Sequence, residues 1–336
     1  MVLHLIIRRL FFLIFVVFAL SIVTFVLMHL VPSDPARNIA GPRASPAAVQ
    51  QIREEYGLDD PVVERYVSYM TGIVQLDFGD SLSSRRPVSD DLKRYLPATF
   101  ELTLAAMAFA IIFGVPLGVI SAVRKNSGID AFGRIVSVIG LSMPSFWLAI
   151  VLQFVFFARL GWLPDGQRLP IGVDPPRTIT TLYSVDALLT LNFDVFVTTI
   201  QHLAMPAFVL GFISLAPVTR MIRSAMLEVL NQDYVRTARA KGLKNNTVIT
   251  RHALKNALLP AITVTGLQLG LLLSGTVLVE IVFSWPGIGR YAFQAIQNQD
   301  PNSLISVTLV IGFAYVLANM IVDIAYIFLD PRIRVT

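Results

Sequence analysis

Six runs of apolar residues constrain the fold of this 336-residue chain more than any other feature. About 20 helical residues are needed to cross the ~30 Å hydrocarbon core of a bilayer. The fourth run is short and is bracketed by Pro206 and Pro217, so its helix is expected to begin nearer Phe193. The runs, which predict an all-α membrane protein with six transmembrane helices, lie at residues 10–31, 99–123, 135–160, 205–218, 258–283 and 304–329.

The composition excludes several classes of protein. Apolar residues make up 55% of the chain and charged residues 15%, which is too apolar for an ordinary soluble domain. The absence of cysteine excludes disulfides, thiolate metal sites and cysteine nucleophiles. The net charge of +5 has no long polar stretch to carry it, so we expect no nucleic-acid partner. The lipid bilayer is the expected surrounding.

The distribution of Lys and Arg predicts the orientation. Residues 220–257 carry eight basic and two acidic side chains, and residues 1–9, 124–134 and 330–336 are also net basic. The intervening loops are net acidic or neutral. Because cytoplasmic loops carry an excess of Lys and Arg, both termini are expected in the cytoplasm. The first run follows Arg8 and Arg9 and is interpreted as a retained helix, since a secretory signal has a shorter apolar core.

Three regions are expected along the chain. Residues 1–31 form an N-terminal tail and the first helix, residues 32–98 an extracytoplasmic helical loop, and residues 99–336 a five-helix core with a cytoplasmic loop at 220–257. In the extracytoplasmic loop, Ser45-Pro46 and Asp60-Pro61 each place a cap residue before a proline. This pattern predicts two short helices, the first of which ends at Gly57.

The chain contains no recognisable hydrolytic motif. The phosphate-binding loop, the H-E-x-x-H zinc motif and the G-x-S-x-G elbow are all absent from the sequence. An ion-coupled secondary carrier remains the alternative, although such carriers place ionisable groups near the membrane midplane. Here only Asp323 lies well inside a run, whereas Glu101, Arg159 and Glu280 lie near outer ends. A membrane hydrolase is less favoured, because a paired nucleophile and base are not evident.

Residues 233–243 predict a short helix on the cytoplasmic side. Asp233 can cap its start, Ala238 and Ala240 keep it slim, and Gly242 can adopt the left-handed conformation that ends a helix. Such a helix can enter a groove on a partner and hold its register through Arg236, Arg239 and Lys241. An ordinary positively charged loop is the competing interpretation.

A second unusual segment follows the fifth run. Proline and two glycines after an aromatic residue, in Ser284-Trp285-Pro286-Gly287, predict a tight turn at the outer end of that run. Trp285 is either an interfacial anchor or part of an outer mouth. Because an exposed Glu280–Arg290 pair would contribute little, we expect apolar side chains to close this mouth. The expected gate residues are Leu278, Val279, Ser284, Trp285, Pro286 and Gly287.

Several motifs together resemble one family. The sequence EVLNQDYVRTARAKGL (228–243) is followed by RHALKNALLP (251–260), FSWPGIGR (283–290) and DPRIR (330–334). With TFVLMHLVPSDP (24–35) and LDFGDSL (76–82), this order resembles the permease subunits of peptide-type ABC importers, in the dipeptide/oligopeptide "B" branch. The general Glu-Ala-Ala loop motif of importers is replaced here by Arg236-Thr237-Ala238, so the docking role rests on the branch-specific string.

The resemblance implies a type I ABC importer permease fold with an extracytoplasmic helical insertion between helices 1 and 2. It implies a non-catalytic subunit for di-/oligopeptides or similar small solutes in a bacterial or archaeal cytoplasmic membrane. The expected partners are a second homologous permease, two ATPase subunits that bind ATP and Mg, and an extracytoplasmic substrate-binding protein. No cofactor is expected in this chain. The ATPase-coupling residues would be Asp233, Tyr234, Arg236, Thr237, Ala238, Arg239, Lys241, Gly242 and Leu243.

Overall fold

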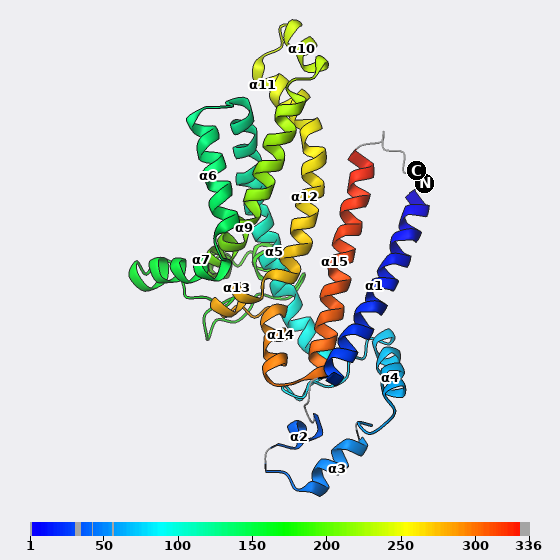
Figure 1. The fold of residues 1–336 in the computed structure, drawn as a ribbon. Helices are drawn as coiled ribbons and strands as arrows, with labels where there is room; N and C mark the ends of the chain where they lie inside the picture. Colours follow the sequence, from blue (N-terminus) through cyan, green and yellow to red (C-terminus); the bar gives the residue numbers. More distant parts are fainter. Residues whose placement is uncertain (1, 31–34, 42, 56, 330–336) are drawn as a thin grey trace.

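The computed structural model describes residues 2–30, 35–41, 43–55 and 57–329. Its described part is helical, with a single isolated β-bridge between Asp80 and Pro87. Five of the described helices are long and apolar enough to cross a membrane. They are α1 (Val2–Leu30), α5 (Val88–Val123), α9 (Phe193–Val229), the stretch Asn245–Leu273, which consists mostly of α12 (Leu254–Gly275), and α15 (Pro301–Leu329) (Figure 1). As expected, the fourth predicted span begins at Phe193.

The third predicted span is not one continuous helix. It is divided into α6 (Gly128–Ser142) and a second rod made of α7 (Ser145–Leu152) and the π-helix η1 (Gln153–Arg159), bent by 103°. The bend falls at Pro144, which caps α7 and lacks the N–H that would continue α6. The described chain therefore has six candidate spans only if this bent pair is counted as one.

Close contacts at glycines hold the centre of the bundle together. A Cβ on Gly118 of α5 would lie 2.7 Å from the carbonyl oxygen of Thr219 on α9, so these two backbones touch. Gly140 of α6 also lies close to α9, where its Cβ would be 3.1 Å from the Phe212 carbonyl oxygen. The result is a tight group of α5, α6 and α9. On its other side α12 packs against α9 and α15, and α15 packs against α1.

Short helices lie at both ends of the bundle (Figure 1). One end carries α10 (Asp233–Ala240), α11 (Asn245–Thr247) and the π-helix η2 (Val248–Ala253). Toward the other end are α2 (Pro35–Ala40), α3 (Pro46–Glu55), α4 (Val62–Val74), α8 (Tyr183–Leu189), α13 (Val277–Val282) and α14 (Ile288–Gln297). The two helices predicted in the loop 32–98 are α3 and α4, and Gly57 after the first has a φ of +56°. The sequence did not predict α2.

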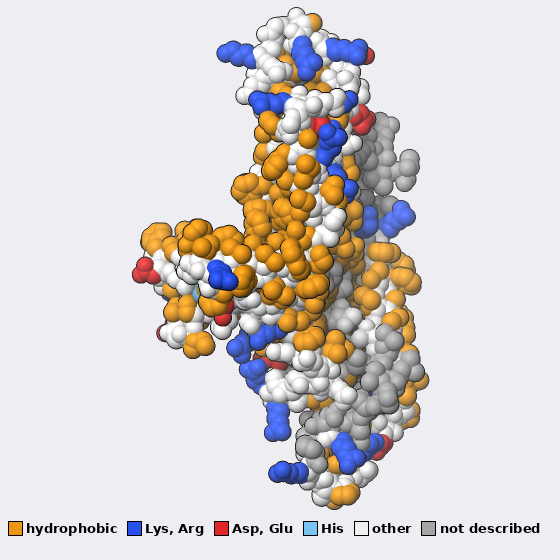
Figure 2. Space-filling model, turned by 60° about the vertical axis from the view of Figure 1, so that its left-hand side comes forward, with side chains coloured by type: hydrophobic (Ala, Val, Ile, Leu, Met, Phe, Trp, Pro, Cys, Tyr) orange, Lys and Arg blue, Asp and Glu red, His pale blue; other side chains and the backbone are white. Residues whose placement is uncertain are grey.

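The surface also differs between the middle of the bundle and its two ends. Figure 2 shows hydrophobic side chains gathered along the middle of the molecule, with Lys and Arg side chains toward its ends. Phe132, Ile135 and Val138 of α6 are each more than half exposed. An apolar band of this kind is the surface that a bilayer or a second membrane subunit covers.

Candidate functional site

Helix α10 follows α9 after a short turn. Its N-cap residue is Gln232, whose side chain makes no capping hydrogen bond. The prediction that Asp233 caps the helix is therefore wrong: Asp233 is the first helical residue, and its Oδ1 lies 3.5 Å from Arg236 Nη1. Its exposed carboxylate still stabilises the helix, because negative charge is favourable at the positive end of the helix dipole.

The C-terminus of α10 has the predicted glycine ending. Gly242 has a φ of +75°, and its N–H donates to the carbonyl of Arg239 at 2.9 Å. The next N–H, that of Leu243, donates to the carbonyl of Ala238 at 3.4 Å. This pair of bonds is a Schellman motif, in which the residue at the Gly242 position must be left-handed. The chain direction after α10 is thus fixed by one glycine.

One face of α10 packs on the helical segment that follows it, and the opposite face is exposed. Val235 and Ala238 are buried against Val248 of η2, with Val229 and Leu230 at the margin. Ala240, predicted to keep the helix slim, is exposed. The exposed side chains of this segment are Asp233, Tyr234, Arg236, Thr237, Arg239, Lys241 and Leu243. This outward surface is net basic, with three basic side chains, one acidic and one aromatic.

Tyr234 connects α10 to α12, the next membrane helix in the chain. Its hydroxyl accepts a hydrogen bond from Asn256 Nδ2 of α12 at 2.7 Å. Helix α10 is therefore connected through covalent turns to α9 on one side, and through η2 and Tyr234 to α12 on the other. A force on α10 acts on two membrane helices at once.

A buried ion pair connects α9 to α6 near the same end. The guanidinium of Arg223 donates to both carboxylate oxygens of Asp130, from Nε at 2.6 Å and from Nη2 at 2.9 Å. Asp130 is fully buried and also accepts from the backbone N–H of Asn126 at 3.0 Å. Sequence reasoning counted Arg223 as a loop charge and missed this pair. The reason is that α9 continues to Val229, so the first part of the predicted loop 220–257 is helical.

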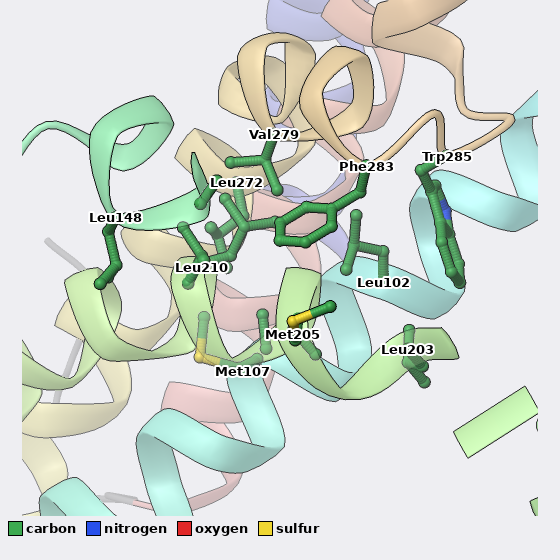
Figure 3. Close-up of a cluster of buried hydrophobic side chains, with 14 of the residues drawn as sticks. Leu102, Met107, Leu148, Leu203, Met205, Leu210, Leu272, Val279, Phe283 and Trp285 are labelled. Atoms are coloured by element: carbon green, nitrogen blue, oxygen red, sulfur yellow. The ribbon is translucent and has the colours of Figure 1, made fainter. Parts of the chain in front are cut away.

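At the opposite end, the turn after α13 is mostly buried, although Ser284 is exposed. Ser284 has a φ of +49°, and the indole Nε1–H of Trp285 donates to the Ala98 carbonyl at 2.9 Å. Since Trp285 is fully buried, its interpretation as an interfacial anchor is wrong. Figure 3 shows Val279, Phe283 and Trp285 in an apolar cluster that includes Leu102, Met107, Leu148, Leu203, Met205, Leu210 and Leu272. Of the expected gate residues, Leu278 lies outside the cluster and is 52% exposed.

Glu280 lies at the centre of this turn. It is fully buried, whereas the sequence predicted an exposed side chain. Its Oε1 accepts from Thr99 Oγ1 at 2.6 Å and Thr276 Oγ1 at 2.9 Å, and its Oε2 accepts from the backbone N–H of Arg290 at 2.8 Å. Thr99 Oγ1 in turn accepts from the N–H of Ile288 at 2.8 Å. The free N–H groups at the start of α14 are thus capped by side chains from α13 and α5.

The Glu280–Arg290 lock considered from the sequence is not formed. The Arg290 guanidinium donates instead to the carbonyl of Ser284 at 2.6 Å. Gly287 is needed for the arrangement, because a Cβ there would lie 2.3 Å from the Glu280 carboxyl group. Pro286 and Gly287 therefore bring the chain close enough for the carboxylate to reach α14.

Residues 160–192, between η1 and α9, pack against the same turn. The sequence did not predict this contact. Arg168 is buried and lies 2.6 Å from Glu101 of α5, whose Oε1 also accepts from the N–H of Ser184 at 2.6 Å. The N–H of Gln167 donates to the Phe283 carbonyl at 2.7 Å. Glu101 and Arg168 are thus a buried pair next to the apolar cluster.

A carboxylate fixes the shape of this segment. Asp186 of α8 is buried and accepts hydrogen bonds from the N–H groups of Ile179, Thr180 and Thr181. Burial alone would raise the pKa of Asp186, but these bonds and one from the Thr180 hydroxyl outweigh it and lower the pKa. Asp186 therefore stays ionised and holds the backbone of residues 179–181 in place through these hydrogen bonds.

Two further sequence expectations concern charges and metals. Within the described residues, His, Asp and Glu side chains form no group of three that could hold a metal ion. The side chain of Asp323 lies outside what the structure describes.

Comparison with known proteins gives two family matches and several close relatives. Residues 114–335 match the family described as binding-protein-dependent transport system inner membrane component, and residues 2–103 match the family of its N-terminal region. The chain is 46% identical over 328 residues to the dipeptide transport system permease protein DppB of Alkalihalophilus pseudofirmus, covering 97% of this chain and 98% of that protein. It is 45% identical over 321 residues to the probable D,D-dipeptide transport system permease protein DdpB of Escherichia coli, covering 96% and 94%. A third relative is the di/tripeptide transport system permease protein DppB of Pseudomonas aeruginosa, at 44% over 329 residues and 97% of both chains.

Proposed function

Since the chain belongs to the family of binding-protein-dependent transport system inner membrane components, we propose that α10 is its coupling helix to an ATPase subunit. As a member of this family, the chain is a multi-pass membrane permease subunit of a peptide-type ABC importer. The comparisons give no support to the ion-coupled carrier. What carries the coupling proposal is the exposed basic face of α10, held rigidly at one end of the bundle.

The proposed complex contains this chain, a second homologous permease, two ATP-binding subunits and an extracytoplasmic binding protein. ATP and Mg would be bound by the ATPase subunits, and this chain would be non-catalytic. The α10 end and both termini would face the cytoplasm, where the basic residues of 220–257 are favoured. Arg236, Arg239 and Lys241 would fix the register of α10 in an acidic groove, and Tyr234 would supply apolar contact.

The packing suggests how movement would reach the opposite end. When ATP closes the two ATPase subunits, α10 would be displaced and α9 would move with it. The Asp130–Arg223 pair and the glycine contacts at Gly118 and Gly140 would carry α6 and α5 along with α9. These helices also supply Leu102, Met107 and Leu210 to the apolar cluster near the outer turn.

The proposed outer gate is that cluster. Val279 and Phe283 of the turn are fully buried against side chains of α5 and α9, so water and a polar solute are excluded there. Moving α5, α9 and the turn bonded to them away from Leu272 of α12 would separate the cluster and open a path to the binding protein. Glu280, Thr99 and the Arg168–Glu101 pair would keep the turn itself intact during this movement.

We propose short peptides as the transported solute. The relatives are named for dipeptides, D,D-dipeptides and di- or tripeptides, and each matches nearly the whole chain. The binding protein would select among these, because a translocation path has to bind weakly enough to release. Calorimetry with the purified binding protein and a panel of peptides tests the solute class.

The coupling proposal is tested with Arg239→Glu in the complete transporter, reconstituted in proteoliposomes with its binding protein. Arg239 is exposed on α10, so charge reversal should weaken docking and lower ATP-dependent peptide uptake about tenfold or more. Lys125→Glu is the matched control, because Lys125 is exposed at the same end but outside α10. Wild-type uptake and normal co-purification of the ATPase with Arg239→Glu would refute the assignment of α10.

A further inference from the structure

The π-helix η2 lies inside a continuous helix. Residues 245–273 form one helical stretch, in which α11, η2 and α12 follow one another without a break. The hydrogen bonds of a π-helix join residues five apart, whereas those of an α-helix join residues four apart. The wide turn of η2 therefore contains one residue more than an α-helical turn. Single π turns inside α-helices are rare and occur frequently at functional sites.

The extra residue aligns two contacts between this helix and α10. Val248, at the start of η2, is buried against Val235 and Ala238. Eight positions later, Asn256 of α12 donates to the hydroxyl of Tyr234. In an uninterrupted α-helix, positions eight residues apart differ by about 80° around the axis, at 100° per residue. One residue taken up by the wide turn reduces this difference to about 20°, so both side chains face α10.

The two ends of η2 belong to different packing units. Its start packs on α10 through Val248. Its last residue, Ala253, is fully buried in a cluster that contains Ala122 of α5 and Ile222 of α9. Between these ends, none of the side chains at 249–252 is buried, and Thr250 is exposed. The hydrogen bonds of the wide turn can therefore change without displacing a buried side chain.

We propose that η2 is the joint through which α10 turns relative to the bundle during the transport cycle. The inference rests on the proposed role of α10 as coupling helix. Closing the wide turn into an α-helical one rotates residues 245–248 by about 100° around the helix axis, and α10 follows because Val248 packs on it. The Tyr234–Asn256 hydrogen bond breaks at little cost, because both side chains are exposed and water replaces the partner. Helix α10 thereby stays seated on the ATPase as the two ATPase subunits close.

Deletion of Thr250 tests this joint, because it removes one exposed residue from the wide turn. The remaining residues form an uninterrupted α-helix, in which Val248 and Asn256 are seven positions and about 20° apart. The resting contacts with α10 are thus kept, but the turn has no extra residue left to release. Thr250→Ala is the matched control, because it removes the same hydroxyl group and keeps the number of residues.

Both variants are assembled into the complete transporter and compared with the unaltered chain. A Val235→Cys/Val248→Cys pair, joined by a short bismaleimide and identified by mass spectrometry, reports whether α10 still packs on η2. The absence of native cysteine makes this cross-link specific within the chain. We expect the Thr250 deletion to keep the cross-link and to co-purify with the ATPase, but to lose ATP-dependent peptide uptake in proteoliposomes. Thr250→Ala should transport normally.

Two results would overturn the proposal. Normal uptake by the deletion variant would mean that the wide turn is dispensable. Loss of the cross-link in that variant would mean that the wide turn is not one inserted residue between two aligned segments. An error in the coupling role of α10 itself is recognised separately, because Arg239→Glu would then keep its uptake. If only the role of η2 is wrong, Arg239→Glu is impaired and the Thr250 deletion is active.

Discussion

The Oγ1 of Thr99 and the Oε1 of Glu280 lie 2.6 Å apart and join α5 to α13 inside the outer turn. Thr99 uses the same hydroxyl to accept the N–H of Ile288, so one side chain links three helices. Both side chains are fully buried. Such a network is costly to leave half-formed, because each buried polar group that loses its partner keeps its desolvation penalty.

Thr99→Val should therefore destabilise the turn by about 1–3 kcal/mol, since it leaves Glu280 and the Ile288 N–H short of a partner. Thr103→Val is a matched control on the same helix: Thr103 is also fully buried, but its hydroxyl has no partner among the described residues. Thermal unfolding of the purified complex measures both. A stability loss from Thr103→Val as large as that from Thr99→Val would contradict the assignment.

Val279 and Leu278 should differ although they are neighbours. Val279→Ser removes an apolar side chain from the closed cluster and adds a hydroxyl, so we expect nucleotide-independent leak of peptide to rise. Leu278→Ser should leave the leak low, because Leu278 is half exposed and lies outside the cluster. Efflux of a loaded labelled peptide from proteoliposomes distinguishes them. Equal leak from both variants would mean that the cluster is not the barrier.

Gly242 should be intolerant of a β-branched side chain. Its left-handed backbone costs about 1–2 kcal/mol for an ordinary L-residue, whereas Asn tolerates it better. We expect Gly242→Val to lower peptide uptake per ATP hydrolysed and Gly242→Asn to retain most of it. Gly128→Val is the control at the same end, because Gly128 has space around it and an ordinary φ. If Gly242→Val couples normally, the ending of α10 has no role in coupling.

Removing Arg223 should leave a buried carboxylate without its main partner. Arg223→Gln is expected to destabilise the complex by about 1–3 kcal/mol, because Asp130 is fully buried and would keep only the Asn126 N–H and the more distant Arg134 as partners. Arg220→Gln, at an exposed position three residues earlier on α9, should have little effect. Chemical denaturation in detergent compares the two. Similar stability of both variants would show that the Asp130–Arg223 pair does not hold α6 to α9.

The orientation can be checked by labelling. Lys244→Cys and Asn245→Cys, exposed beside α10, should react with a membrane-impermeant maleimide only after the inner face is opened. Gln51→Cys should react in intact cells. Reaction of position 244 or 245 from outside would reverse the proposed topology.

The sequence by itself determined most of the membrane helices and the two helices α3 and α4, and where several of them begin and end. Apolar runs of the right length predicted the membrane helices, because hydrocarbon leaves backbone groups no partner except those within the helix. Gly242 predicted the end of α10 for an equally local reason, since one left-handed residue closes the helix. The family motifs were readable for the same reason, because they are contiguous in the chain.

Only the tertiary structure decided what the isolated polar residues do. Glu280, Trp285 and Arg223 looked like an exposed acid, an interfacial anchor and a loop charge, but each is bonded to a residue far away in the sequence. Their partners Thr99, Ala98 and Asp130 carry no sequence signal that points to them. A buried hydrogen bond depends on which helix faces come together, and periodicity along one helix does not specify its neighbour's register.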